Sequence, residues 1–274
     1  MSASVRAPLA ELASAAPALA ADGVSRRFGG LTALDGISFS VEAGEFVSII
    51  GPSGCGKSTL FSIVGGLDQG YDGSVRVQGA AIRGPHPAIG MVFQEQSTLP
   101  WRNVLENVAF PLEMRGVGRA ERRERSRHFV ELVGLQGFEQ RYPDELSGGM
   151  RQRVAIARTL AMQPDILLMD EPFGALDEQT RLLLGEKVLQ IQQTLRQTTL
   201  LITHSISEAV QLSDRVVVMT YRPGRVKQII TVPLPRPRTE DVLQSEAFGR
   251  TVAEIWRNLR EEASRGMAES ERRT

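Results

Sequence analysis

The sequence of 274 residues predicts an α/β fold built on a mostly parallel sheet. Short β-rich runs alternate with helical patterns, and several of these runs are apolar on both faces, as strands of a covered parallel sheet must be. We expect such strands at residues 46–50, 166–169, 200–203 and 216–219. Two further runs, 37–41 and 75–77, alternate between apolar and polar residues and favour an antiparallel sheet near the N-terminus.

Between residues 96 and 162 the pattern becomes helical. Residues 119–133 begin charged and end apolar, and residues 150–162 predict a second helix that stops before Pro164. This stretch is therefore expected to be a helical insertion in the sheet domain. The dense charges of residues 119–127 favour a solvated helix face over a binding patch.

The two ends of the chain have their own composition. Residues 1–21 are rich in Ala, Ser and Pro, and we expect a disordered tail, because Glu11 and Pro17 interrupt the apolar core that a secretion signal would need. Residues 236–274 are expected to form a linker and a helical extension. Its apolar stripe favours packing onto the domain, with a partner contact or a small regulatory element as the alternatives. The stripe consists of Val252, Ile255, Trp256 and Leu259.

Charge and cysteine content limit the possible functions. The 32 basic and 32 acidic side chains give no net charge, so there is no general electrostatic signal for nucleic acid, and we expect no nucleic-acid partner. The single cysteine, Cys55, can form no internal disulfide and fits a reducing compartment. No apolar run approaches the roughly 20 residues that span a bilayer.

The run GPSGCGKST lies between a predicted strand and a predicted helix. Gly51 and Gly56 let the backbone curl so that amide N–H groups converge on phosphates at a helix N-terminus. Lys57 adds a positive charge for the β- and γ-phosphates, and the Ser58 hydroxyl can ligate Mg²⁺. A glycine-rich turn that matches by accident is the weaker alternative. The predicted phosphate-binding residues are Gly51, Pro52, Ser53, Gly54, Cys55, Gly56, Lys57, Ser58 and Thr59.

Two acidic residues follow the strand expected at residues 166–169. Ligands of parallel sheets bind at the carboxyl ends of strands, where Asp170 and Glu171 stand. Asp170 is placed to hold the Mg²⁺ shell, and Glu171 to face the water that attacks the γ-phosphate. Alone, such a pair would favour a helix cap or a solvated turn. A phosphate loop in the same chain reverses that preference.

A second candidate anion site begins at Leu146. Ser147 is a typical N-cap residue, and Gly148 and Gly149 expose backbone amides at the start of the next helix. An ordinary capped helix is the alternative interpretation of this run. Together with the phosphate loop and the acidic pair, the run resembles the ATP-binding-cassette (ABC) family, whose signature has the form LSGGQ.

The resemblance covers about residues 22–235 and implies the fold and chemistry of that family. The expected fold is α/β, a P-loop NTPase core with a mostly parallel sheet, an N-terminal antiparallel β subdomain and a helical subdomain over about residues 96–162. ATP and Mg²⁺ are the implied cofactors, and ATP hydrolysis is the implied activity. The implied catalytic residues are Lys57, Gln94, Glu171 and His204, and the implied metal ligands are Ser58, Gln94 and Asp170.

Other positions match the family one at a time. Phe28 matches the aromatic residue that stacks on adenine, although tyrosine is more usual there. Gln94 matches the glutamine that touches Mg²⁺ and the attacking water, with a solvent-facing glutamine as the alternative. Asp177 matches a loop at the dimer interface, and His204 a contact to the γ-phosphate. Ser147, Gly148 and Gly149 would complete the site of a second copy.

Two residues depart from the usual pattern. Met150 stands in place of the signature glutamine, and Ser205 follows His204 where aspartate is common. The first change removes a possible polar contact with the nucleotide sugar of the second copy. Neither change removes a group that the chemistry requires.

The sequences LSGGMRQR, LPW at 99–101, ENV at 106–108 and LMDEPFGALD at 168–177 resemble the nitrate, sulfonate and taurine importer subgroup. This resemblance implies a peripheral homodimer on the cytoplasmic face of the inner (plasma) membrane. Transmembrane permease subunits and a periplasmic or extracellular substrate-binding protein are the implied partners. An exporter ATPase and a soluble cassette acting on nucleic acid or ribosomes remain alternatives. A regulatory cassette without hydrolysis is disfavoured because Lys57, Glu171 and His204 are all present.

Overall fold

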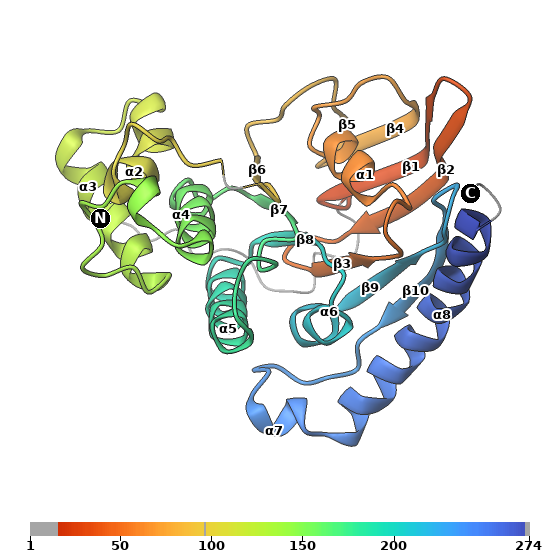
Figure 1. The fold of residues 1–274 in the computed structure, drawn as a ribbon. Coiled ribbons are helices and arrows are strands. Elements are labelled where there is room, and N and C mark those ends of the chain that lie inside the picture. Colours follow the sequence, from red (N-terminus) through yellow and green to blue (C-terminus); the bar gives the residue numbers. More distant parts are fainter. Residues whose placement is uncertain (1–15, 96, 272–274) are drawn as a thin grey trace.

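The computed structural model describes residues 16–95 and 97–271, which form two sheets and a group of helices (Figure 1). The strands are β1 (Leu19–Phe28), β2 (Leu31–Val41), β3 (Phe46–Ile50), β4 (Asp72–Val77), β5 (Ala80–Ala81), β6 (Ile89–Val92), β7 (Ile166–Asp170), β8 (Thr198–Ile202), β9 (Arg215–Met219) and β10 (Val226–Thr231). The helices are α1 (Lys57–Val64), α2 (Val104–Met114), α3 (Arg119–Leu132), the 3₁₀ turn η2 (Pro143–Glu145), α4 (Gly148–Ala161), α5 (Glu178–Leu195), α6 (Ile206–Leu212), α7 (Glu240–Leu243) and α8 (Glu246–Glu271).

The larger sheet has the strand order β10-β9-β3-β8-β7-β6. All neighbouring pairs are parallel except β9 and β10. The four strands expected from doubly apolar runs are β3, β7, β8 and β9, and every residue of β3, β7 and β8 is buried. One apolar cluster covers one face of this sheet under α4 and α5, and a second lies between the other face, α1 and the antiparallel sheet. The mostly parallel α/β prediction is therefore confirmed.

The smaller sheet is antiparallel, in the order β2-β1-β4-β5. It confirms the antiparallel sheet predicted from residues 37–41 and 75–77, and it corrects the extent of the predicted tail. β1 begins at Leu19, so residues 19–21 belong to the sheet, with Leu19 and Ala21 fully buried. Ala20 and Ala21 are small and carry little strand preference, so the sequence did not indicate a strand at this point. Residues 1–15 of the predicted tail lie outside the described part of the chain.

The helical insertion forms a lobe beside the sheets, made of α2, α3 and α4 (Figure 1). The helix expected at 119–133 is α3, and the one expected at 150–162 is α4, which starts earlier because Ser147 caps it. Asn103 and Glu106 form a capping box at the start of α2. The buried Asn107 amide donates to the carbonyls of Leu99, Arg102 and Asn103 and so fixes the segment that enters the lobe.

The C-terminal extension packs onto the larger sheet, where α8 runs along the β9–β10 edge and contacts α6 (Figure 1). Ile255 is fully buried, and Val252 and Leu259 pack against the same apolar cluster. Trp256 is 57% exposed, so its assignment to the packing stripe was wrong. It follows Ile255 directly, about 100° further around the helix, and that turn takes it off the buried face.

The proline-rich segment before α7 is anchored by two arginines. Arg236 pairs with Asp214 at 2.8 Å, and the buried Arg238 donates to the carbonyls of Val210 and Ser213 at 2.8 and 3.1 Å. Burial lowers the pKa of Arg238 to about 10, with the nearby Arg236 charge adding to the effect. The linker is thus attached to the sheet before the chain reaches α8.

Candidate functional site

The phosphate loop, residues 51–59, follows β3 and leads into α1. Gly54 and Gly56 have φ angles of 74° and 99°, in the region that favours glycine. A Cβ on Gly56 would lie 2.7 Å from Leu34 Cδ2 and 3.0 Å from the Ala33 carbonyl oxygen. The loop therefore needs glycine here both for its backbone angle and for its packing on β2.

Lys57 is buried at the start of α1. Its ammonium donates to the carbonyls of Gly51 and Pro52 at 2.8 and 3.0 Å, so the charge is held inside the loop. The neighbouring Cys55 is also buried, and burial raises the pKa of its thiol. Cys55 thus fills space under the loop as a neutral side chain.

A cavity of about 370 Å³ opens between the phosphate loop and Phe28. Phe28 is 48% exposed, and the Arg26 guanidinium lies 4.4 Å from its ring centroid. Arg26 is held in turn by Asp68 at 2.9 Å. One face of the Phe28 ring is thus covered by a cation, which leaves the other face for a flat apolar ligand. The lining residues are Phe28, Leu31, Ala33, Ser53, Gly54, Gly56, Lys57, Ser58, Thr59, Glu171 and Arg222.

Three predicted catalytic side chains meet beyond the ends of neighbouring strands. Glu171 Oε2 lies 3.3 Å from Gln94 Nε2 and 3.3 Å from His204 Nδ1. β6, β7 and β8 are adjacent and parallel, which brings the residues after them to one edge of the sheet. Glu171 has φ 46°, and its backbone N–H donates to the Ile202 carbonyl at 2.8 Å. This left-handed turn directs the carboxylate toward both partners.

Asp170 ends β7 and has a buried side chain whose Oδ1 has no hydrogen-bond partner within the described residues. Burial raises the pKa of this carboxyl, and the Glu171 charge adds to it, whereas the Ser58 hydroxyl and Lys57 oppose it. A buried, unpaired carboxylate oxygen is costly alone and is suited to a cation. Asp170, Ser58 and Gln94 supply the oxygen ligands that Mg²⁺ prefers, so this set of residues fits that ion.

The signature run and Asp177 lie outside the cavity, since none of these residues lines it. Ser147 Oγ accepts the Met150 N–H at 3.2 Å and caps α4. Asp177 accepts the Thr180 N–H at 2.9 Å and caps α5, and this bond lowers the pKa of Asp177. Both side chains are exposed. A Cβ on Gly149 would lie 2.9 Å from Leu176 Cδ2, so the two exposed segments pack together in one chain.

The helical lobe is tied to the segment that carries Gln94. The Gln152 amide of α4 donates to the Phe93 carbonyl at 3.3 Å, and the Thr159 hydroxyl donates to the Met91 carbonyl at 3.1 Å. Phe93 also meets Phe61 of α1 edge to face, with ring centroids 5.9 Å apart. The segment before Gln94 therefore contacts both the lobe and the helix that follows the phosphate loop.

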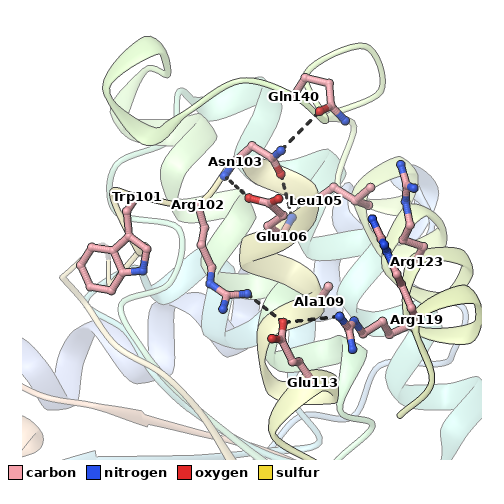
Figure 2. Close-up of a pocket in the computed structure, with 11 residues that line it drawn as sticks. Trp101, Arg102, Asn103, Leu105, Glu106, Ala109, Glu113, Arg119, Arg123 and Gln140 are labelled. Carbon is pink, nitrogen blue, oxygen red and sulfur yellow. Dashed lines mark hydrogen bonds and ion pairs between the residues drawn. The ribbon is translucent and has the colours of Figure 1, made fainter. Parts of the chain in front are cut away.

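A second cavity, of about 540 Å³, lies in the helical lobe (Figure 2). Trp101 stands at its edge and is 71% exposed. Glu113 lies between Arg102 at 2.9 Å and Arg122 at 3.9 Å, while Arg119 and Arg123 extend from α3. The cavity therefore combines an exposed indole ring with an excess of positive charge.

Comparison with known proteins identifies the family. The ABC transporter family profile matches residues 34–174. The chain belongs to the ABC transporter family. An uncharacterized ABC transporter ATP-binding protein of Methanocaldococcus jannaschii is 50% identical over 223 residues, 81% of this chain and 84% of that protein. This chain is an ABC ATPase that binds ATP, as the resemblance predicted.

Two further relatives of this ABC ATPase have names that state a solute. The aliphatic sulfonates import ATP-binding protein of Bacillus cereus is 44% identical, covering 82% of this chain and 87% of that protein. The nitrate import ATP-binding protein of Synechocystis is 47% identical, covering 76% and 78%. A dimeric ATP-binding cassette bound to ADP and phosphate matches the fold with TM-score 0.70 and 32% identity, over 78% of this chain and 98% of the other.

Two residues that line or flank the predicted site were not expected from the sequence. Arg222 lines the cavity between the phosphate loop and Phe28, and Arg26 covers Phe28, although neither was predicted. Arg222 contacts a residue 168 positions away, and no local pattern indicates such a pairing. Among the described helices of this ABC ATPase, none has the length and apolar character needed to cross a bilayer.

Proposed function

We propose that the protein is the energy-coupling subunit of an ABC importer for a small organic or inorganic solute of the nitrate, sulfonate or taurine type. It would work as a homodimer on separate permease subunits at the cytoplasmic face of the membrane. The proposed ATP hydrolysis is supported mainly by one observation: the Glu171 carboxylate contacts both Gln94 and His204 and lines the same cavity as the phosphate loop.

The proposed roles follow from this geometry. Phe28 would stack on adenine with its uncovered face, and residues 51–59 would bind the phosphates through backbone amides and Lys57. Glu171 would accept a proton from the attacking water, with Gln94 and His204 fixing the direction of its carboxylate. Ser58, Gln94 and Asp170 would hold Mg²⁺, which supplies charge stabilisation at the phosphates when bound.

Dimer formation is supported by the position of the signature run. Ser147 and Asp177 are exposed and stand apart from the cavity of their own chain. Amides at the start of α4 would meet the ATP of a second copy, as the family resemblance implies, and Asp177 would lie at the contact between the copies. The similarity to a dimeric cassette agrees with this arrangement.

The permease contact is supported by the cavity of the helical lobe (Figure 2). An exposed indole beside a basic cavity suits the end of a cytoplasmic helix that carries apolar and acidic residues. The lobe is hydrogen-bonded to the segment before Gln94, so movement of such a helix would reach the catalytic residues.

The importer assignment is tested with the complete assembly. The ATPase is purified with its native permease in lipid, and phosphate release is measured with candidate solutes and the native substrate-binding protein. We expect a nitrate-like, sulfonate-like or taurine-like solute, together with the binding protein, to raise turnover. The same complex carrying Glu171→Gln serves as the control for contaminating ATPases. Absence of stimulation by every solute, with retention on ribosomes or DNA, would overturn the transporter assignment.

A further inference from the structure

The turn between β9 and β10, residues 220–225, packs directly on the phosphate loop. Gly224 donates its N–H to the Ala33 carbonyl at 2.9 Å and accepts the Asp35 N–H at 3.0 Å. A Cβ on Gly224 would lie only 2.1 Å from the Cys55 carbonyl oxygen. The turn and the phosphate loop are therefore in backbone contact, although they are far apart in sequence.

Arg222 extends from this turn to the outer end of the phosphate loop. Its Nε donates to the Gly54 carbonyl at 2.9 Å. Within residues 16–95 and 97–271, its two terminal nitrogens make no hydrogen bond and no ion pair. The side chain is exposed and lines the nucleotide cavity. An arginine anchored through Nε thus presents its remaining N–H groups beside the cavity.

Two cationic side chains, Lys57 and Arg222, contact different carbonyls of the phosphate loop. Lys57 directs its ammonium to the carbonyls of Gly51 and Pro52 at the inner end of the loop. Arg222 donates instead to the carbonyl of Gly54, a different residue of the loop. Guanidinium groups bind phosphate oxygens through planar pairs of N–H donors, so Arg222 is suited to a phosphate group of a ligand in this cavity.

Helix α8 holds the turn that carries Arg222. The Glu262 carboxylate, only 2% exposed, accepts the Tyr221 N–H at 3.0 Å. The same carboxylate pairs with Lys227 at 3.0 Å and with Arg265 at 3.3 Å. Another cavity, of about 290 Å³ and separate from the cavity of the helical lobe, lies between the turn and α8 and is also lined by Arg222. The position of Arg222 between two cavities thus depends on a buried carboxylate of the C-terminal extension.

We propose that Arg222 is a further phosphate-binding residue of the nucleotide site and that Glu262 of α8 positions it. The inference rests on the ATP site proposed above and adds to it a contact from outside residues 51–59. Arg222 donates to a phosphate oxygen of the bound nucleotide, and Glu262 acts through the backbone of Tyr221. The C-terminal extension therefore contributes to nucleotide affinity without touching the nucleotide.

The first experiment measures nucleotide affinity by displacement of a fluorescent ATP analogue in the full-length protein. Arg222→Gln should weaken ATP binding about tenfold, the loss expected for a charge-assisted hydrogen bond, and leave adenosine binding unchanged. Arg222→Lys should recover part of the loss. The control is Arg225→Gln, which removes a cation of the same turn that is already paired with Asp35. Equal losses in both variants, or equal losses for ATP and adenosine, would overturn the phosphate contact.

The two proposals fail in different ways. If the wild-type protein bound no ATP, the nucleotide site itself would be wrong. If the wild type bound ATP and Arg222→Gln bound it equally well, only the role of Arg222 would be excluded.

The second experiment tests the role of α8. Glu262→Ala should weaken ATP binding by a smaller factor, about threefold, and should add nothing in the double variant with Arg222→Gln. Glu262→Gln, which keeps an acceptor for the Tyr221 N–H, should bind ATP like the wild type even if it unfolds at lower temperature. Arg260→Gln, at an exposed position of the same helix, is the control. Additive losses in the double variant would show that α8 does not act through Arg222.

Discussion

Replacement of Glu171 by Gln separates the proton-accepting role of this residue from its structural contacts. The Glu171 carboxylate is joined to Gln94 and His204 at 3.3 Å each, and its side chain is 21% exposed. An amide of the same length keeps one acceptor oxygen for Gln94 and His204, which share Oε2 of the carboxylate, removes the negative charge and replaces the other oxygen with an NH₂ donor. We therefore expect little change in folding stability and a large change in turnover.

The size of the effect follows from the role. A positioned general base contributes about 10²- to 10⁴-fold to rate, which corresponds to about 3–5 kcal/mol in the activation free energy. In the proposed site, ATP binding depends on the phosphate loop, Phe28 and Lys57, none of which the substitution alters. Removing a negative charge beside the phosphates lowers repulsion, so ATP affinity should be equal or higher. The long-lived ATP state should favour the closed dimer.

The assay combines steady-state phosphate release with equilibrium binding of ATP and size measurement by light scattering. The control is Glu178→Gln, which removes the same charge at an exposed position in the first turn of α5, seven residues further along the chain. Turnover of Glu171→Gln within about threefold of the wild type would refute the assignment of Glu171 as proton acceptor. A matching loss in Glu178→Gln would instead indicate a general charge effect.

Three further predictions test packing, pH dependence and coupling. Ile255→Ala should lower the free energy of unfolding by about 2–5 kcal/mol in urea titrations, whereas Trp256→Ala on the exposed face should change it by less than about 1 kcal/mol. Burial raises the pKa of Glu208 above its ordinary value of 4.5, so the folded protein loses stability as pH rises above 4.5. Glu208→Gln should therefore have a higher free energy of unfolding than the wild type near pH 8. A difference between the two that stays constant from pH 4 to 8 would contradict this. Trp101→Ala should leave the ATPase rate of the isolated protein unchanged, because Trp101 is exposed and lies in the helical lobe. In the permease complex it should abolish stimulation and reduce affinity for the permease at least about tenfold. Stimulation at the wild-type level would exclude this surface as the permease contact.

The parts of the fold that the sequence predicted are those set by local pattern. β3, β7 and β9 came from runs of apolar residues, because strands covered on both faces have no polar side to interrupt the run. Glu171 was predicted from its place after a strand and His204 from the family resemblance, and one feature of the fold brings the two together. Each follows a strand of one parallel sheet, and the ends of such strands share an edge.

The features that sequence could not supply depend on pairs far apart in the chain. Leu19 and Ala21 are buried because β2 and β4 flank them, and a run of alanines carries no periodic signal of its own. Arg26 over Phe28 and Arg222 on Gly54 are arginines among many others in the sequence. Only the folded chain distinguishes them from solvated surface charges.

Glu171 contacts two side chains that belong to different parts of the molecule, His204 and Gln94. A movement of one part relative to the other would therefore change the surroundings of the Glu171 carboxylate. His204 follows β8 of the larger sheet, whereas Gln94 follows a segment whose carbonyls at Met91 and Phe93 accept hydrogen bonds from α4. Because α4 also begins at the exposed signature run, one helix joins that surface to the segment before Gln94, a partner of the carboxylate that we propose as proton acceptor. A displacement of the helical lobe would change the Gln94 contact while leaving the His204 contact in place. The arrangement therefore gives closure on a second copy a direct structural route to the group that we propose activates water.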